Sequence, residues 1–191
     1  MPVTLSQNAE ADALLDRDPL ALLIGMVLDQ QVPLEKAFSS PLELTKRLGH
    51  DLDACELAEY DSDALAALFA ERPALHRFPT SMAGRVQGVA RFLVADYAGD
   101  VTKLWDGARD GQELLARITA LPGFGEQKGA IYLALLGKQR GVRVPGWREA
   151  AGDYGKDGVY MSVADIVDAE SLLRVRDYKQ QRKAAAKAGA K

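Results

Sequence analysis

The chain has 191 residues, 48% of them hydrophobic and 27% charged, enough to bury one sizeable core or two small lobes that share an interface. One cysteine and two histidines cannot supply a structural zinc site, an iron–sulfur cluster or an intrachain disulfide. The composition therefore predicts an ordinary globular protein with no metal and no cofactor, and we expect a monomer.

The sequence also lacks the patterns of membrane insertion and secretion. Its start has neither the basic segment nor the apolar segment of a signal peptide, and its longest apolar run, residues 21–28, is far too short to span a bilayer. We therefore expect a cytoplasmic protein with no membrane partner.

The charge is unevenly distributed along the chain. Residues 172–191 carry seven basic side chains and one acidic one, a net +6, so residues 1–171 carry −9 of the total −3. A basic arm on an acidic body favours a polyanionic partner, although a solvated helix whose lysines only keep it soluble is an equal alternative. The Ala- and Lys-rich end, KAAAKAGAK, is expected to be disordered or a weak helix.

Helical periodicity dominates the body of the chain. An apolar run that begins at Asp18-Pro19 predicts a buried helix with proline in its first turn. After Val32-Pro33, the segment LEKAF predicts a short helix that ends at Ser39-Ser40-Pro41, where a serine caps the next helix, LELTKRLG, closed by Gly49.

Further helices are predicted in chain order at residues 62–71, 82–97, 112–120, from about 126 to 139, and from Ser162 into the tail. No run shows sustained β alternation, so the predicted fold class is all-α. Residues 141–160 predict a long loop with at most a turn of helix at WREAA, and long loops inside compact domains are more often functional than decorative.

A glycine hairpin, LPGFG at residues 121–125, runs straight into one of these helices. Glycines let the backbone approach a ligand closely, and the first amides of a helix together with its dipole favour an anion. Dinucleotide and P-loop motifs need a strand before the glycines, whereas QELLARITA here is helical. Helix, hairpin, helix is the geometry by which DNA-repair proteins hold a backbone phosphate; a pure packing turn is the alternative.

The hairpin and the helices before it resemble those of a known protein family. LPGFGEQKGAIYLALLG is similar to the helix-hairpin-helix of the HhH-GPD superfamily of base-excision DNA glycosylases, and most similar to its small actinobacterial-type branch. MAGRVQGVARFLVADYAGD resembles the helix before the hairpin, and LLIGMVLDQQVPLEKAF resembles the first core helix. The resemblance covers residues 22–147 and implies an HhH-GPD helical domain over 1–171, in one or two lobes, with a basic tail over 172–191.

The resemblance implies roles for residues that would contact DNA. Gly123 and Gly125 would offer backbone amides to a phosphate, and Phe124 would pack the hairpin into the body. Gln31, together with Gln30, would fill the gap left when a base is flipped out of the duplex, or would be no more than a polar helix end.

The catalytic positions of the family are not matched. Gln127 stands where lyase-competent members carry a lysine, and Lys128 is turned about 100° away on the helix, where it would contact phosphate at most. Pro145 stands where the catalytic aspartate is expected. The nearest acids, Glu149 and Asp153, are the candidate replacements.

Aromatic residues of the same loop complete the candidate site. Trp147 and Tyr154 would line a base pocket by stacking, or be buried in the core. The expected function is a nucleoid-associated DNA-binding protein of base excision repair that hydrolyses an N-glycosidic bond without a lyase step. The alternatives are a non-catalytic damage sensor and a hairpin that serves protein contact only.

Overall fold

The computed structural model describes residues 3–188, and all regular structure in that part of the chain is helical. Since none of the described residues forms a strand, the predicted all-α fold class is confirmed. None of the described helices is long and apolar enough to cross a membrane. The last lysine of the basic tail, Lys191, lies outside the described residues.

The α-helices are α1 (Ala9–Arg17), α2 (Pro19–Leu28), α3 (Leu34–Leu48), α4 (Ala54–Glu59), α5 (Ser62–Ala70), α6 (Pro79–Tyr97), α7 (Gly111–Thr119), α8 (Glu126–Gln139), α9 (Trp147–Ala150) and α10 (Ala169–Ala188). Short 3-10 turns lie at η1 (Val101–Leu104), η2 (Gly152–Gly155) and η3 (Val163–Asp165). Most predicted runs form helices close to their expected bounds, whereas α1 and α4 were not predicted.

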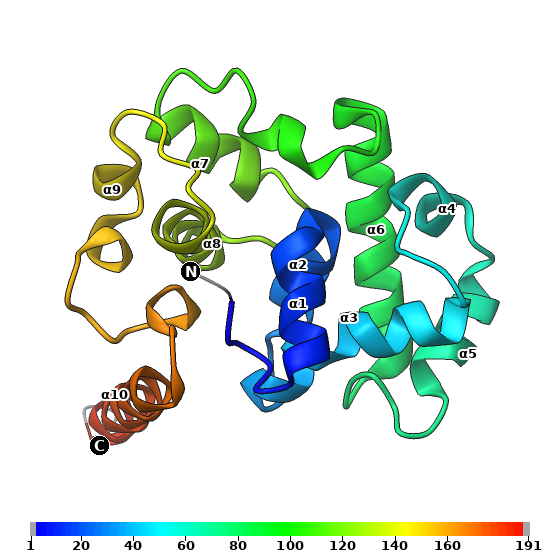
Figure 1. Cartoon of the computed structure of the whole chain (residues 1–191), viewed down its shortest axis with the longest axis horizontal. Helices are drawn as coiled ribbons and strands as arrows, with labels where there is room; N and C mark the ends of the chain where they lie inside the picture. The colour runs from blue at the N-terminus through cyan, green and yellow to red at the C-terminus, as the bar shows by residue number, and fades with distance from the viewer. Residues whose placement is uncertain (1–2, 189–191) are drawn as a thin grey trace.

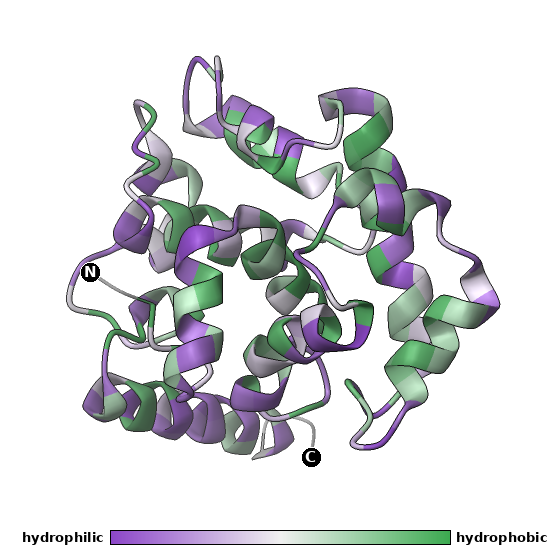
Figure 2. Cartoon of the chain, turned by 45° about the vertical axis from the view of Figure 1, so that its right-hand side comes forward, coloured by the Kyte–Doolittle hydropathy of each residue, from purple (hydrophilic) through white to green (hydrophobic). Residues whose placement is uncertain are grey.

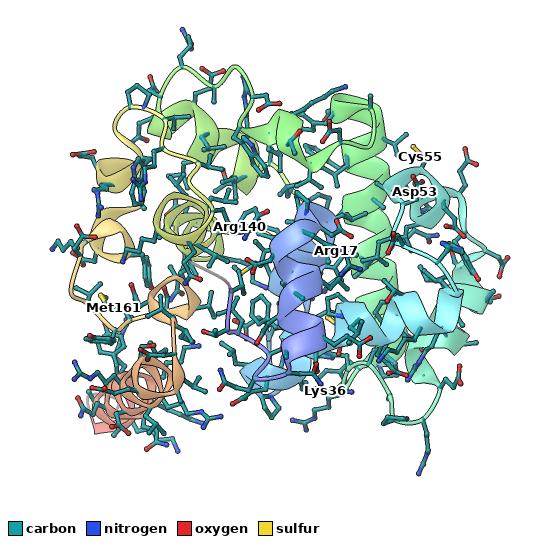
Figure 3. All side chains as sticks on the ribbon, in the orientation of Figure 1. Arg17, Lys36, Asp53, Cys55, Arg140 and Met161 are labelled. Atoms are coloured by element: carbon teal, nitrogen blue, oxygen red, sulfur yellow. The ribbon has the colours of Figure 1, made fainter. Side chains whose placement is uncertain are left out.

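Helices α1–α6 lie on one side of the molecule and α7–α10 on the other (Figure 1). On the first side α6 packs against α4 and α5, and α2 against α3; on the second, α8 packs against α7, η2 and η3. One hydrophobic core is continuous through both groups. At their junction Arg140, at the end of α8, donates to the Asp16 carboxylate of α1 at 2.6 Å, and its label in Figure 3 lies between the two groups.

Helix α2 is the central element of the first group. Asp18 precedes it in an extended conformation, and its carboxylate accepts a hydrogen bond from the Leu20 amide at 2.8 Å, which satisfies one amide of the first turn. Pro19 has no amide to satisfy. All residues from Leu20 to Leu28 are buried, so the apolar run predicted as a buried helix is one.

The predicted break at Ser39-Ser40-Pro41 is wrong, because α3 runs through it without interruption. Pro41 cannot donate to the preceding turn, and a local reading of proline predicts a helix end there. The Ser40 hydroxyl instead lies 2.7 Å from the Lys36 carbonyl and 2.7 Å from the Leu75 carbonyl, which ties this turn to a distant loop. Phe38 on the same helix is fully buried, which favours the helix at this point.

The irregular segment after α8 is folded back tightly against that helix. It contains α9, at the predicted helical turn, followed by η2. A Cβ on Gly137 would lie 2.3 Å from a ring carbon of Trp147, so only glycine lets the indole pack so closely on α8. Beyond it, the Lys138 ammonium pairs with the nearly buried Asp165 carboxylate at 2.5 Å and holds the end of the segment.

The basic tail is not disordered within the described residues, since α10 continues to Ala188. Leu172 and Val175 bury its first turns against the body, and Arg176 donates to Glu35 of α3. Residues 179–187 are exposed. In Figure 2 this helix runs along one edge of the molecule and is coloured mainly as hydrophilic. Residues 189–191 of the KAAAKAGAK end lie outside the described part.

Candidate nucleic-acid interface

The hairpin joins α7 and α8 through residues 120–125. The Phe124 amide donates to the Leu121 carbonyl at 3.0 Å, which closes the turn. Gly123 has a φ of +81°, a left-handed conformation that side chains disfavour. Phe124 is 5% exposed, and its ring centroid lies 6.0 Å from that of Tyr132. The aromatic ring thus anchors the hairpin to the core, as predicted, and leaves the backbone on the surface.

The first turn of α8 presents unpaired backbone amides. A helix leaves its first amides without intrahelical acceptors, and here no side chain caps the N-terminus. Within the described residues, no hydrogen bond uses the amides of Gly125, Glu126 or Gln127, whereas the next glycine, Gly129, donates to the Gly125 carbonyl at 2.9 Å. Converging amides and the positive end of the helix dipole are suited to a phosphate.

Gly125 leaves the space above these amides open. Its φ of −82° and ψ of 177° are accessible to any residue, so the backbone does not demand glycine. A Cβ at this position would have no atom within 4 Å, so packing does not demand glycine either. The missing side chain therefore leaves this part of the hairpin open to approach from outside.

Lys128 points inward, away from this surface. Its ammonium donates to the Met26 carbonyl at 2.8 Å and lies 5.7 Å from the centroid of the Phe124 ring. Burial lowers the pKa of Lys128, and the nearby Asp29 carboxylate opposes that effect. The predicted phosphate contact of Lys128 does not fit this position, because the side chain is used to join the hairpin to the C-terminal end of α2.

The two glutamines after α2 differ in their surroundings. Gln30 is held in the structure, since its Nε2 donates to the Val27 carbonyl at 2.7 Å and its Oε1 accepts from Arg85 at 3.0 Å. Gln31 is exposed, has a left-handed φ of 56°, and its side chain makes no hydrogen bond to any described residue. Of these two glutamines, Gln31 is the one whose side chain makes no hydrogen bond within the described residues.

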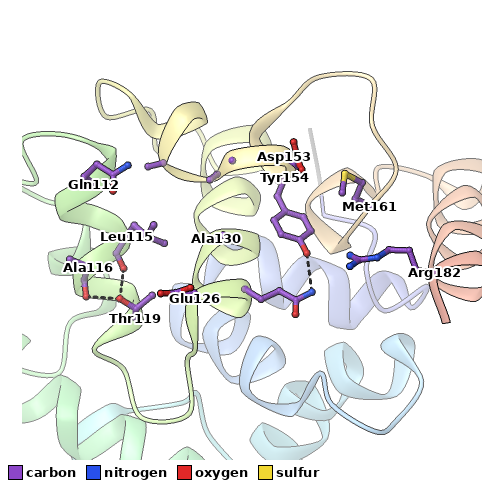
Figure 4. Close-up of a pocket in the computed structure, with 14 residues that line it drawn as sticks. Gln112, Leu115, Ala116, Thr119, Glu126, Ala130, Asp153, Tyr154, Met161 and Arg182 are labelled. Carbon is purple, nitrogen blue, oxygen red and sulfur yellow. Dashed lines mark hydrogen bonds between the residues drawn. The ribbon is translucent and has the colours of Figure 1, made fainter. Parts of the chain in front are cut away.

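A groove of about 740 Å³ lies beside the hairpin, between α7, α8 and the η2 segment. Gln127 and Tyr154 line it, and the side-chain Nε2 of Gln127 donates to the Tyr154 hydroxyl at 2.9 Å (Figure 4). Arg182 extends toward the groove from α10. The hydrogen bond places Gln127 and Tyr154 together at one wall of the groove.

The other predicted loop residues are placed less favourably for chemistry. Asp153 is at the groove but pairs with Lys156 at 2.6 Å, and this hydrogen bond and charge lower the pKa of the carboxyl. Glu149 is exposed and lines a separate hollow. Trp147 is buried against α8 rather than lining the groove, so the core alternative holds for it. An exposed carboxylate with lowered proton affinity is a poor general acid or base.

Pro145, which the sequence resemblance aligned with a catalytic aspartate, makes a structural contact. Its carbonyl accepts a hydrogen bond from the Gly111 amide at 2.7 Å, at the start of α7. This bond holds the loop to the first helix of the hairpin. No group of three or more potential metal-ligating side chains occurs in the described part of the chain.

Asp29 is a candidate that sequence reasoning missed. It follows the last turn of α2 directly and is partly buried. Burial raises the pKa of Asp29 above its usual value, and Lys179 and Lys128 oppose that rise. Within the described residues, no donor forms a hydrogen bond with its carboxylate. The available signal was an acid placed directly after nine apolar or small residues and directly before Gln30-Gln31.

The raised pKa of Asp29 predicts an unusual dependence of stability on pH. The folded state binds the proton of the Asp29 carboxyl more tightly than the unfolded state does. This proton therefore adds to the free energy of unfolding at low pH, and that contribution is lost as pH rises above about 4. Asp29→Asn removes the buried charge, so its thermal midpoint should exceed that of wild type at pH 7 and approach it toward pH 4. Circular dichroism melts across this range measure the difference.

Asp153→Asn is the matched control. The carboxyl of Asp153 has a lowered pKa and is exposed, so its loss cannot raise the midpoint at pH 7. If Asp29→Asn gives the same profile as Asp153→Asn, the buried carboxylate at the end of α2 does not carry the predicted electrostatic cost.

Comparison of the chain with protein-family models, with curated proteins and with solved structures gives no match.

Proposed function

We propose that this protein binds DNA by holding a backbone phosphate on the hairpin at residues 121–125, as part of base excision repair. The observation that carries the proposal is the set of unpaired backbone amides at Gly125, Glu126 and Gln127. Neither backbone conformation nor packing requires glycine at position 125, and its missing side chain leaves these amides open. This combination of donors, positive dipole and open approach is suited to a phosphate oxygen.

Two further features lie near the same end of the molecule. The Lys128 ammonium, one residue beyond the amides, contacts the carbonyl of Met26, and so joins the hairpin to the end of α2 that precedes the exposed Gln31. Arg182 of the basic helix α10 reaches the groove beside Gln127. A duplex held at the hairpin would therefore contact Gln31, whose side chain could enter it, and the positive charge of Arg182.

The resemblance to the HhH-GPD superfamily extends this proposal to chemistry. We propose a monofunctional DNA glycosylase that hydrolyses the N-glycosidic bond of an altered base after extruding its nucleotide. The alternative is a damage sensor that binds DNA without cleaving it, and the solvated state of Asp153 and Glu149 favours it as long as these are the only acids considered.

DNA binding is tested directly with a fluorescent 20-base-pair duplex and a titration of salt. Phosphate contacts release counterions, so log Kd should rise linearly with log salt concentration, with a slope set by the number of phosphates contacted. Absence of binding at low salt, or binding that is indifferent to salt, would contradict the proposal and favour a hairpin used for protein contact.

Enzyme and sensor are separated by a panel of lesions. Duplex and single-stranded oligonucleotides carrying uracil, hypoxanthine, alkylated purines or oxidised bases are incubated with the protein, and abasic sites are then cleaved with alkali. Strand breaks with any lesion support the glycosylase. Tight lesion binding without breaks supports the sensor.

No Schiff-base step is expected with any of these substrates. By the resemblance, Gln127 stands where lyase-competent members of the HhH-GPD superfamily carry a lysine, and the ammonium of Lys128 is directed to the carbonyl of Met26. Borohydride should therefore trap no covalent protein–DNA adduct, as judged by denaturing gel electrophoresis. A trapped adduct that disappears in Lys128→Met would show that this lysine leaves its observed position to attack the sugar.

A further inference from the structure

The carboxylate of Asp29 stands where a negative charge is unfavourable. Asp29 is the C-cap residue of α2, at the end where the helix dipole is negative and carbonyls lack intrahelical donors. The Asp29 amide donates to the Gly25 carbonyl at 2.9 Å, but within the described residues its carboxylate receives no hydrogen bond. Partial burial adds to the cost of its charge. A group retained at such a cost is a candidate for function.

Cations approach this carboxylate from two other helices without pairing with it. Lys128 of α8 and Lys179 of α10 both lower the proton affinity of Asp29. The Lys128 ammonium, however, donates to the Met26 carbonyl at 2.8 Å, and no salt bridge joins either lysine to Asp29 in the described structure. The carboxylate thus keeps its capacity to face a further positive charge.

Its position relative to the proposed DNA contacts is specific. Asp29 precedes Gln31 by two residues, and Lys128, whose ammonium contacts the backbone of α2 three residues before Asp29, lies in the first turn after the hairpin. If the hairpin holds a phosphate and Gln31 fills the gap of an extruded base, the sugar of that nucleotide lies between the two contacts. Asp29 lies on the same stretch of chain.

We propose that Asp29, rather than Asp153 or Glu149, is the catalytic carboxylate, and that it stabilises the positive charge that develops on the deoxyribose of an extruded nucleotide. The inference rests on the proposed function. In the reaction the bond from C1′ to the base nitrogen breaks and its electron pair leaves with the base. Water adds its oxygen to C1′ and gives up a proton through Asp29, and the base gains a proton, so the products are the free base and an abasic site.

The test needs no knowledge of the lesion. Two duplexes are compared, one with a pyrrolidine nucleotide, which is cationic and resembles the charged sugar, and one with the neutral tetrahydrofuran nucleotide. Wild-type protein should bind the pyrrolidine duplex at least 10-fold more tightly. Asp29→Asn should lose that preference while its Kd for the tetrahydrofuran duplex stays within about 2-fold of wild type.

Asp153→Asn and Glu149→Gln are the matched controls and should retain the preference. A preference that persists in Asp29→Asn but disappears in Asp153→Asn would return the role to the loop. Equal binding of the two duplexes by wild type would overturn the Asp29 proposal and leave DNA binding intact. Failure to bind either duplex would overturn DNA binding itself, and the Asp29 proposal with it. Thermal melts of each variant show whether a lost preference reflects lost folding. The same melts are made for Lys128→Met, which alters the lysine beside Asp29.

Discussion

Gly125→Asp should weaken DNA binding strongly while leaving the protein as stable as wild type or more so. The backbone at Gly125 is extended and its Cβ position is open, so aspartate fits without strain. Its carboxylate would accept hydrogen bonds from the amides of Gln127 and Lys128, as aspartates do at other helix starts, and this is worth about 1 kcal/mol. The same hydrogen bonds would occupy the proposed phosphate site.

The expected loss is large. Two charge-assisted hydrogen bonds contribute about 3 kcal/mol together, so the Kd for duplex DNA should rise about 100-fold at low salt. Fluorescence anisotropy gives the Kd, and a thermal melt gives the stability. Weaker DNA binding together with an unchanged or higher thermal midpoint would identify the amides, rather than the fold of the hairpin, as the site of binding.

Gly49→Asp is the control for the added charge. Gly49 follows α3, and Asp51, two residues later, lies near Arg17 and Asp18 at the start of α2. Asp29 marks the other end of that helix. The added charge therefore lies toward the end of α2 that is opposite to Asp29. The change should cost some stability because Gly49 has a φ of +83°, but should alter the Kd by less than about 3-fold at moderate salt. Equal losses in both variants would show that net charge, not the hairpin, governs binding.

Gln31→Gly should also separate function from stability. Gln31 has a left-handed φ of 56°, which costs a residue with a side chain about 1 kcal/mol and costs glycine nothing. The variant should therefore melt about 2–4 °C higher than wild type. Without the side chain, nothing fills the gap of an extruded nucleotide, so affinity for a duplex with an abasic site should fall about 10-fold and approach that for undamaged DNA.

Gln7 provides a closely matched control. It is also an exposed glutamine, with a φ of 57°, and lies before α1. Gln7→Gly relieves the same backbone strain and should leave the preference for the abasic duplex unchanged. A loss of preference in both variants, or in neither, would contradict the assignment of Gln31 as the side chain that enters the duplex.

The sequence by itself determined the local features of this protein. Proline after Asp18 and glycines at positions 49 and 123 act through their own backbone preferences, so the start of α2, the end of α3 and the turn of the hairpin could be predicted. Helical periodicity predicted the all-α class in the same way, because the spacing of apolar residues reflects a single helix and its buried face.

Only the tertiary structure decided the directions of the side chains at the candidate site. Lys128 contacts a carbonyl 102 residues earlier in the chain, and no local rule distinguishes that contact from a phosphate on the surface. At the turn where α3 continues through Pro41, the Ser40 hydroxyl contacts the distant Leu75 carbonyl, and the close packing of Trp147 on α8 requires glycine at position 137. Local preferences fix where helices begin and end, whereas the environment of a side chain depends on which distant segments pack against it. For that reason the sequence pointed to Asp153 and Glu149, and the packing of α2, α8 and α10 pointed to Asp29.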